Sequence, residues 1–158
     1  MRPYAAAMRR YAGGLAVVAV LIAPIAGSAQ QSDPERVVRE FLVPFANRDF
    51  DRFIPYFAED ATMFFPPANA APTSLVRGRA NIEKAFKTLY SAYPRPAGAA
   101  PNAITPRDLL VQESGDHAVV TFALGNDAAP GRRTIVLRRI ANQWQIVHLH
   151  GSSAGQSK

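Results

Sequence analysis

Residues 132–150 read RRTIVLRRIANQWQIVHLH. The stretch holds two runs rich in β-branched and aromatic residues, 133–140 and 143–150, on either side of Ala141 and Asn142. Such runs around a two-residue break predict two antiparallel strands joined by a tight turn. Two earlier runs of the same kind, 108–113 and 117–124, flank a Gly-Asp pair. The C-terminal half is therefore predicted to be a meander of four strands.

The N-terminal half has helical periodicity instead. Ser32 and Glu35 have the spacing of a capping box, and apolar residues then recur at helical spacing up to Phe45. Pro44 lies inside this pattern and is expected to kink or end the helix. Asp49 can cap a second, short helix, followed by a short strand over 62–65. A third helix is predicted over 79–93, directly after Gly78. Helices followed by a meander indicate an α+β fold, with the helices on one face of a curved, mixed or antiparallel sheet.

The first 29 residues have the composition of a secretory signal. Arg2, Arg9 and Arg10 form a basic head, residues 12–26 are largely apolar, and 27–29 are the small residues Gly-Ser-Ala. The apolar run is too short for a comfortable membrane span, which needs about 20 residues. We therefore expect an exported protein, periplasmic or secreted, with a signal peptide at 1–29, one domain at 30–158 and no membrane association after cleavage.

Charge and cysteine content exclude several classes. Three of the 18 basic residues and none of the 12 acidic residues lie in the signal segment, so its removal lowers the net charge from +6 to +3. With the remaining bases spread along the chain, this is a poor electrostatic match for nucleic acid. The sequence contains no cysteine, which excludes disulfides, thiolate metal sites and thiol nucleophiles.

Two passages carry a family resemblance. The motifs DFD at 49–51, FAEDAT at 57–62 and FP at 65–66 resemble the nuclear transport factor 2-like (NTF2-like) superfamily, in particular ketosteroid isomerases and SnoaL-like proteins. The motif WQIVHLHGS at 144–152 resembles the last strand of the association domain of calcium/calmodulin-dependent protein kinase II, and VRGR at 76–79 fits the entry to the third helix. The resemblance implies a cone in which three N-terminal helices pack on a bent sheet around a pocket.

The resemblance also argues against steroid isomerisation. That chemistry needs a carboxylate base, a tyrosine hydroxyl and a protonated acid. The family's base position falls on Phe65 and its first-helix tyrosine on Phe41, while residues 131–140 contain no acid at all. We therefore expect no steroid isomerase activity.

The histidines are the first candidates for chemistry in the pocket. His148 and His150 are two apart on one predicted strand, as are Trp144 and Ile146, so strict alternation would turn all four toward the cone. A histidine there could be a general base, a hydrogen-bond donor or a metal ligand; equally, one could be structural and the other at the rim. Zinc usually takes three protein ligands, and His117 is the one further histidine, so we expect neither a metal site nor a cofactor.

The remaining candidates would bind rather than react. The kinase association domains carry arginines in their pocket, and Arg133 is the candidate here for an anionic ligand. The residues expected to line the pocket are Phe41, Phe45, Tyr56, Phe65, Phe86, Tyr90, Trp144 and Ile146. The leading prediction is a homodimer that binds a small, largely apolar or anionic molecule in its cone. Two alternatives stay open: a histidine-dependent dehydratase, cyclase or isomerase, and an oligomerisation module.

Overall fold

The computed structural model describes residues 33–66, 68, 71–125, 127 and 130–153, so the predicted signal peptide lies outside the described residues. Three α-helices, one 3-10 helix and six strands form within these ranges. In chain order they are α1 Pro34–Asn47, α2 Phe50–Phe53, η1 Ile54–Tyr56, β1 Phe57–Phe64, β2 Val76–Arg77, α3 Arg79–Ala92, β3 Arg107–Ser114, β4 His117–Leu124, β5 Gly131–Ile140 and β6 Gln143–Ser153.

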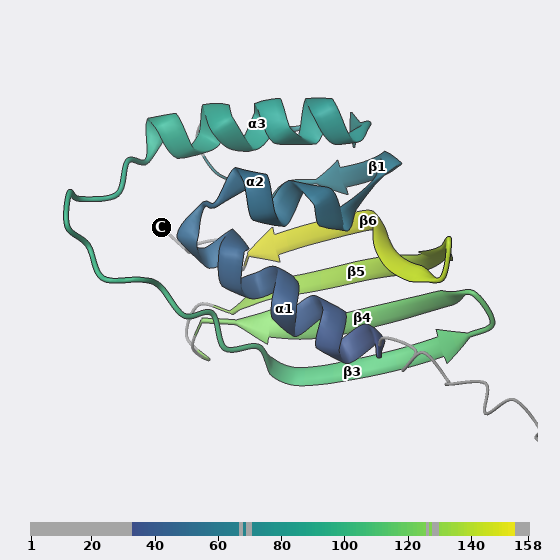
Figure 1. The fold of residues 1–158 in the computed structure, drawn as a ribbon. Helices are drawn as coiled ribbons and strands as arrows, with labels where there is room; N and C mark the ends of the chain where they lie inside the picture. The colour runs from purple at the N-terminus through teal and green to yellow at the C-terminus, as the bar shows by residue number, and fades with distance from the viewer. Residues whose placement is uncertain (1–32, 67, 69–70, 126, 128–129, 154–158) are drawn as a thin grey trace, which may run out of the picture.

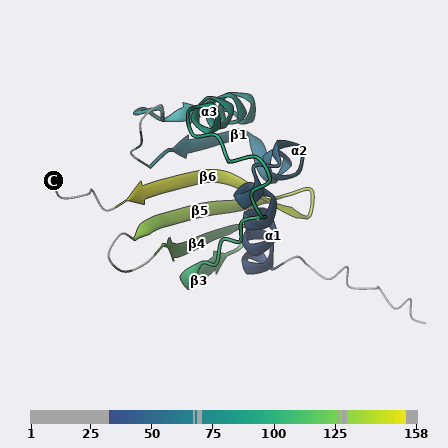
Figure 2. The ribbon, with the colours of Figure 1, turned by 90° about the vertical axis from the view of Figure 1, so that its left-hand side faces the viewer.

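The six strands form one mixed sheet in the order β2-β1-β6-β5-β4-β3. The pairing of β1 with β6 is parallel, and the other pairings are antiparallel. The helices α1 and α2 lie in front of the sheet, and α3 runs along the β1 edge (Figure 1). The second view shows β6 to β3 side by side with α1 at one end of them (Figure 2). The α+β fold with a curved sheet is confirmed, but α3 follows β1 and β2 in the chain, so the helices are not all N-terminal.

The ends of α1 differ from the prediction. Asp33 is the N-cap, and its Oδ1 accepts a hydrogen bond from the Glu35 backbone N–H at 3.0 Å. Ser32, the predicted cap, lies outside the described residues. The helix continues for three residues beyond Pro44 and ends where Arg48 takes a left-handed conformation. The predicted cap of the second helix is confirmed, because Asp49 accepts from the Arg52 backbone N–H.

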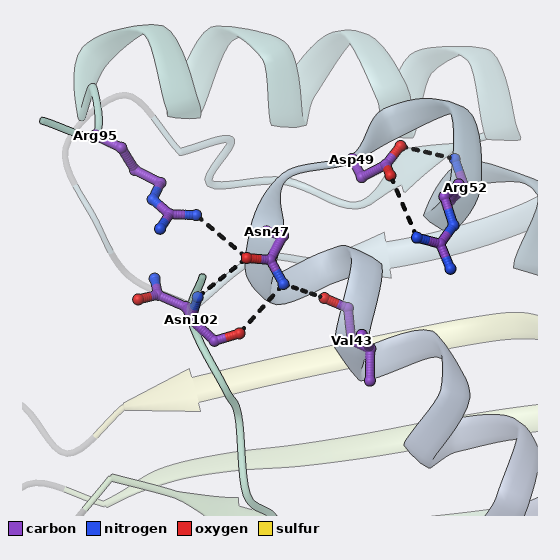
Figure 3. A network of polar contacts seen from close by, with 6 residues as sticks. All are labelled: Val43, Asn47, Asp49, Arg52, Arg95 and Asn102. Carbon is purple, nitrogen blue, oxygen red and sulfur yellow. Dashed lines mark hydrogen bonds and ion pairs between the residues drawn. The ribbon is translucent and has the colours of Figure 1, made fainter. Parts of the chain in front are cut away.

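The long connection from α3 to β3 is attached to the end of α1 (Figure 3). The Asn47 amide donates to the carbonyls of Val43 at 2.9 Å and Asn102 at 3.2 Å. Its carbonyl oxygen accepts from the Asn102 backbone at 3.0 Å and from Arg95 at 3.5 Å. One side chain therefore holds this proline- and alanine-rich segment against the helix that covers the sheet.

A β-bulge in β6 changes which face its side chains occupy. Val136 of β5 pairs with His148, but the next residue, Leu137, pairs with Ile146, so Val147 is an extra residue opposite β5. An extra residue reverses the alternation of every residue that follows it. Trp144 and Ile146 are buried before the bulge, whereas Leu149 and Gly151 are buried after it and His150 is exposed.

Close packing fixes the end of β6 against the segment after β1. A Cβ atom on Gly151 would lie 2.8 Å from the Cδ atom of Pro66, a separation that real Cβ atoms do not adopt. Glycine is therefore required at the point where β6 crosses the segment that follows β1. This contact holds Pro66 at the rim of the interior space described next.

Candidate functional site

A small apolar cavity, partly open to solvent, lies between the sheet and the helices. Its volume is about 170 Å³, and it lies among α1, α3 and the inner face of β1, β4, β5 and β6. The lining residues are Phe41, Leu42, Phe45, Met63, Phe65, Pro66, Phe86, Leu89, Tyr90, Phe122, Leu124, Arg133, Ile135 and Leu149. The first candidate site is therefore an aromatic and aliphatic chamber with two polar side chains, Tyr90 and Arg133.

Five of the eight predicted lining residues are at this cavity: Phe41, Phe45, Phe65, Phe86 and Tyr90. Ile146 is fully buried in the core, and Tyr56 and Trp144 line a separate surface groove beside Glu40 and Gln143. The sequence identified the apolar residues near the site, but it could not separate those that fill the core from those that border the space.

The positions of Phe41 and Phe65 bear on steroid isomerisation, the chemistry that the sequence argues against. Both rings line the cavity, Phe41 from α1 and Phe65 directly after β1. A phenyl ring at each position supplies neither a base nor a hydroxyl. The described lining contains no carboxylate and no imidazole.

Arg133 reaches the cavity from β5, on the same face as Ile135. The Nη1 atom of Arg133 donates to the carbonyl of Arg132 at 2.7 Å and to that of Ser152 at 3.0 Å. Burial lowers the pKa of the Arg133 guanidinium below its ordinary value. Arg133 forms no ion pair with any carboxylate in the described part of the chain. The cavity therefore holds a half-buried cation with backbone partners only.

Tyr90 contributes a phenol from α3. Burial raises the pKa of Tyr90 to about 12, although the nearby Arg48 acts in the opposite direction. The Arg48 guanidinium carbon lies 4.5 Å from the centre of the Tyr90 ring. The phenol therefore remains protonated at neutral pH and can form hydrogen bonds, but it is not a base there.

The predicted placement of the histidines in the cone is wrong. Because Val147 is bulged, His148 and His150 lie on the outer face of the sheet, away from Trp144 and Ile146. The Nδ1 atom of His148 lies 2.8 Å from the Thr62 hydroxyl oxygen, and the Phe64 ring contacts both imidazoles, with centroid distances of 6.1 Å and 5.8 Å. Burial, and then the neighbouring His150, lower the pKa of His148 below 6.5.

Two features are absent from the described part of the chain: a cluster of metal-binding side chains and a membrane-spanning helix. Among the described residues, no group of three or more histidine, aspartate and glutamate side chains is arranged to hold a metal ion. None of the helices in those ranges is both long enough and apolar enough to cross a membrane.

The sequence profile of the SnoaL-like domain matches residues 35–156, which is most of the chain. The chain belongs to the SnoaL-like domain family. A comparison with curated protein sequences found no significant match. This match, together with the solved structures described next, confirms the predicted NTF2-like superfamily.

Solved structures of several NTF2-like proteins resemble this SnoaL-like domain. An NTF2-like protein of unknown function from Pseudomonas putida KT2440 is 18% identical, with a TM-score of 0.64 over 81% of this chain and 89% of that chain. A suspected ketosteroid isomerase from Parabacteroides distasonis ATCC 8503 is 20% identical, with a TM-score of 0.59 over 82% and 94%. The S. rosetta CaMKII hub is 26% identical, with a TM-score of 0.57 over 78% and 98%. The first two similarities concern the fold alone.

Proposed function

We propose that this SnoaL-like domain binds a small, largely apolar or anionic molecule in its cavity. The observation that carries the proposal is the composition of the lining, which is apolar except for Tyr90 and Arg133. Clefts of this kind, with few polar groups among apolar side chains, are typical of small-molecule sites.

The same lining favours binding over acid-base catalysis. A general base must lie within hydrogen-bond reach of the proton that it abstracts. His148 and His150 are on the outer face of the sheet, and the Tyr90 phenol is protonated at neutral pH. A steroid isomerase is also disfavoured, because Phe41 and Phe65 occupy the positions where the resemblance would place the tyrosine and the base.

The test of binding is native mass spectrometry of residues 30–158 purified from an exporting host. We expect an added mass that is lost on denaturation. A Leu124→Trp variant fills the cavity and should lose this mass, whereas Leu110→Trp, on an exposed position, should keep it. Circular dichroism of both variants checks the fold. An absence of added mass, together with no thermal shift from any apolar or carboxylate-bearing compound, would contradict the proposal.

A homodimer formed through the outer face of the sheet is a second proposal. No described helix covers this face, and it carries two exposed apolar side chains, Phe64 at 40% and Leu110 at 55%. A sheet face without a covering helix can pack face to face on the same face of a second copy. The similarity to the S. rosetta CaMKII hub also supports assembly. Light scattering should give twice the chain mass, and a Phe64→Arg, Leu110→Arg double variant should give the monomer. A monomeric parent protein would exclude the dimer.

Export is the third part of the proposal, and it depends on the composition of residues 1–29. Expression of the full chain in a bacterial host should yield a protein with an N-terminus near Gln30 outside the cytoplasm. Full-length protein retained in the cytoplasm would contradict export.

A further inference from the structure

Arg133 is a charged group in an apolar space, and its surroundings specify what a ligand must provide. Taking a cation out of water is unfavourable unless a counter-charge or hydrogen bonds replace the lost hydration. Two backbone carbonyls supply part of this replacement, and no carboxylate of the described chain supplies the rest. An anionic group on the ligand would supply the missing counter-charge.

The hydrogen bonds that Arg133 already makes determine which edge of the guanidinium is available. Both bonds from Nη1 go to backbone carbonyls, those of Arg132 and Ser152. The Nε and Nη2 atoms donate to no described residue. These two atoms form one planar edge with parallel N–H groups, whose spacing matches the two oxygens of a carboxylate.

We propose that the ligand of this cavity is a monocarboxylate, bound by the Nε–Nη2 edge of Arg133, with an apolar body of about one ring filling the rest of the space. The inference rests on the proposed function and names the ligand class for the same site. One guanidinium carries one positive charge, which a monocarboxylate neutralises, whereas a phosphate dianion would keep a second, uncompensated negative charge among apolar side chains.

The size of the body follows from the volume. A cavity of about 150 Å³ lined by apolar side chains is large enough to bind benzene, and this cavity measures about 170 Å³. Aryl carboxylates with one ring, or branched aliphatic acids of similar bulk, therefore fit better than a steroid or a long acyl chain.

Gly131 is a positioning residue for this arrangement. A Cβ atom at Gly131 would lie 3.3 Å from Nη1 and 3.5 Å from Nη2 of Arg133. The guanidinium therefore packs directly over the glycine backbone, and even an alanine would require it to shift. A small shift misaligns the edge with the carboxylate without removing the charge.

The experiment is calorimetric titration of the mature protein with matched probes. Benzoate, phenylacetate, 3-phenylpropionate and 4-methylpentanoate are each compared with the corresponding neutral primary amide. We expect at least one acid to bind about 10- to 100-fold more tightly than its amide, the range for hydrogen bonds to charged groups. Equal affinity of acid and amide for every pair would overturn the inference while leaving the apolar cavity as a binding site.

Variants assign the preference to the proposed edge. Arg133→Met should abolish the preference for acid over amide, and Gly131→Ala should reduce it about threefold or more while keeping the charge. Arg138→Met is the matched control, because Arg138 is on the same strand and pairs with Asp60 on the outer face, 3.2 Å away; it should keep the preference. A folded Arg133→Met protein that still prefers the acid would refute the role of Arg133. If neither acids nor amides bind, the inference and the proposed function fail together.

Discussion

The inner and outer faces of this sheet carry polar groups of different kinds. On the inner face, Arg133 lies among aromatic and aliphatic side chains and bonds to backbone carbonyls. On the outer face, Arg138 pairs with Asp60, and His148 bonds to Thr62 near solvent. The outer arginine has a carboxylate partner, whereas the inner arginine bonds to backbone carbonyls alone among the described residues. The inner face is therefore the better candidate for a ligand site. The sequence alone had pointed to the two histidines, which lie on the outer face.

The extra residue Val147 determines which of the following side chains of β6 lie on the inner face and which on the outer face. Because of this residue His148 faces outward and Leu149 faces inward, so exchanging the two side chains (His148→Leu, Leu149→His) would put an imidazole in the core and a leucine on the outer face. We expect the largest effect of any change considered, a loss of more than about 4 kcal/mol or failure to fold, because the core would lose a leucine and take up an imidazole without a hydrogen-bond partner. Urea denaturation followed by the fluorescence of the single tryptophan measures this. Val147→Ala keeps the bulge and should lose only about 1 kcal/mol.

Alanine substitutions on either side of the bulge should differ sharply. Leu149→Ala removes a buried side chain and should lower the unfolding free energy by about 2–5 kcal/mol. His150→Ala, on the exposed side, should change it by less than about 0.5 kcal/mol. The same urea titration reports both values. Comparable losses for the two variants would place His150 in the core and contradict the bulge.

Replacing Arg133 on the inner face should change the unfolding free energy by a smaller amount, and the sign of this change is informative. Arg133→Met deletes two hydrogen bonds but also removes the unfavourable burial of a charge, so the ligand-free protein should be unchanged or up to about 1 kcal/mol more stable. Arg138→Met, which breaks an exposed ion pair on the outer face, should lose less than about 1 kcal/mol. A loss of 2 kcal/mol or more in Arg133→Met would show that Arg133 is mainly a structural residue.

The smallest expected effect is the pH dependence of stability that comes from His148 on the outer face. The pKa of His148 is lowered by burial and by His150, whereas in the unfolded chain it keeps its ordinary value of 6.5. As pH falls through 6.5, the unfolded state therefore takes up the proton first, and the folded protein loses stability until the folded pKa is passed. NMR titration should find the His148 imidazole titrating below 6.5.

A His148→Asn variant isolates this contribution. Asparagine can keep a hydrogen bond to Thr62, but it does not titrate. The variant should lose less stability than the parent protein between pH 7.5 and pH 5, since the other titrating groups are common to both. Identical pH profiles would contradict a lowered pKa for His148.

The sequence predicted most of the fold because its signals were local. Hydrophobic runs separated by Gly-Asp and Ala-Asn located the four C-terminal strands to within a few residues. The two-residue strand β2 was missed because it is too short to show any periodicity. Asp33 was passed over as the cap of α1 because Ser32 has the capping-box spacing to Glu35, and the two residues are adjacent.

The site was harder to predict, because the set of residues that face inward changes part-way along one strand, β6. The alternation that buries Trp144 and Ile146 stops at Val147, and a second alternation begins that buries Leu149 and Gly151. The adjacent pair Ile146-Val147 is the one signal of this change in the sequence. Two neighbouring apolar residues are also common in strands without a bulge, so the pattern alone could not move the histidines outward. The structure places Arg133 at the cavity on the same face as Ile135, because the alternation of β5 has no interruption between the two residues. Its role in binding an anion stays a prediction.

The position of β6 within the sheet has a consequence for synthesis of the protein. This strand is the last of the described strands in chain order, yet it lies between β1 and β5 and hydrogen-bonds to both. While a nascent chain still lacks residues 143–153, β1 and β5 each present an unpaired edge, and the two parts of the sheet have no strand to join them. The ribosome must therefore release nearly all of this domain before its sheet can close, and a premature stop codon before β6 would leave two exposed edges that favour aggregation.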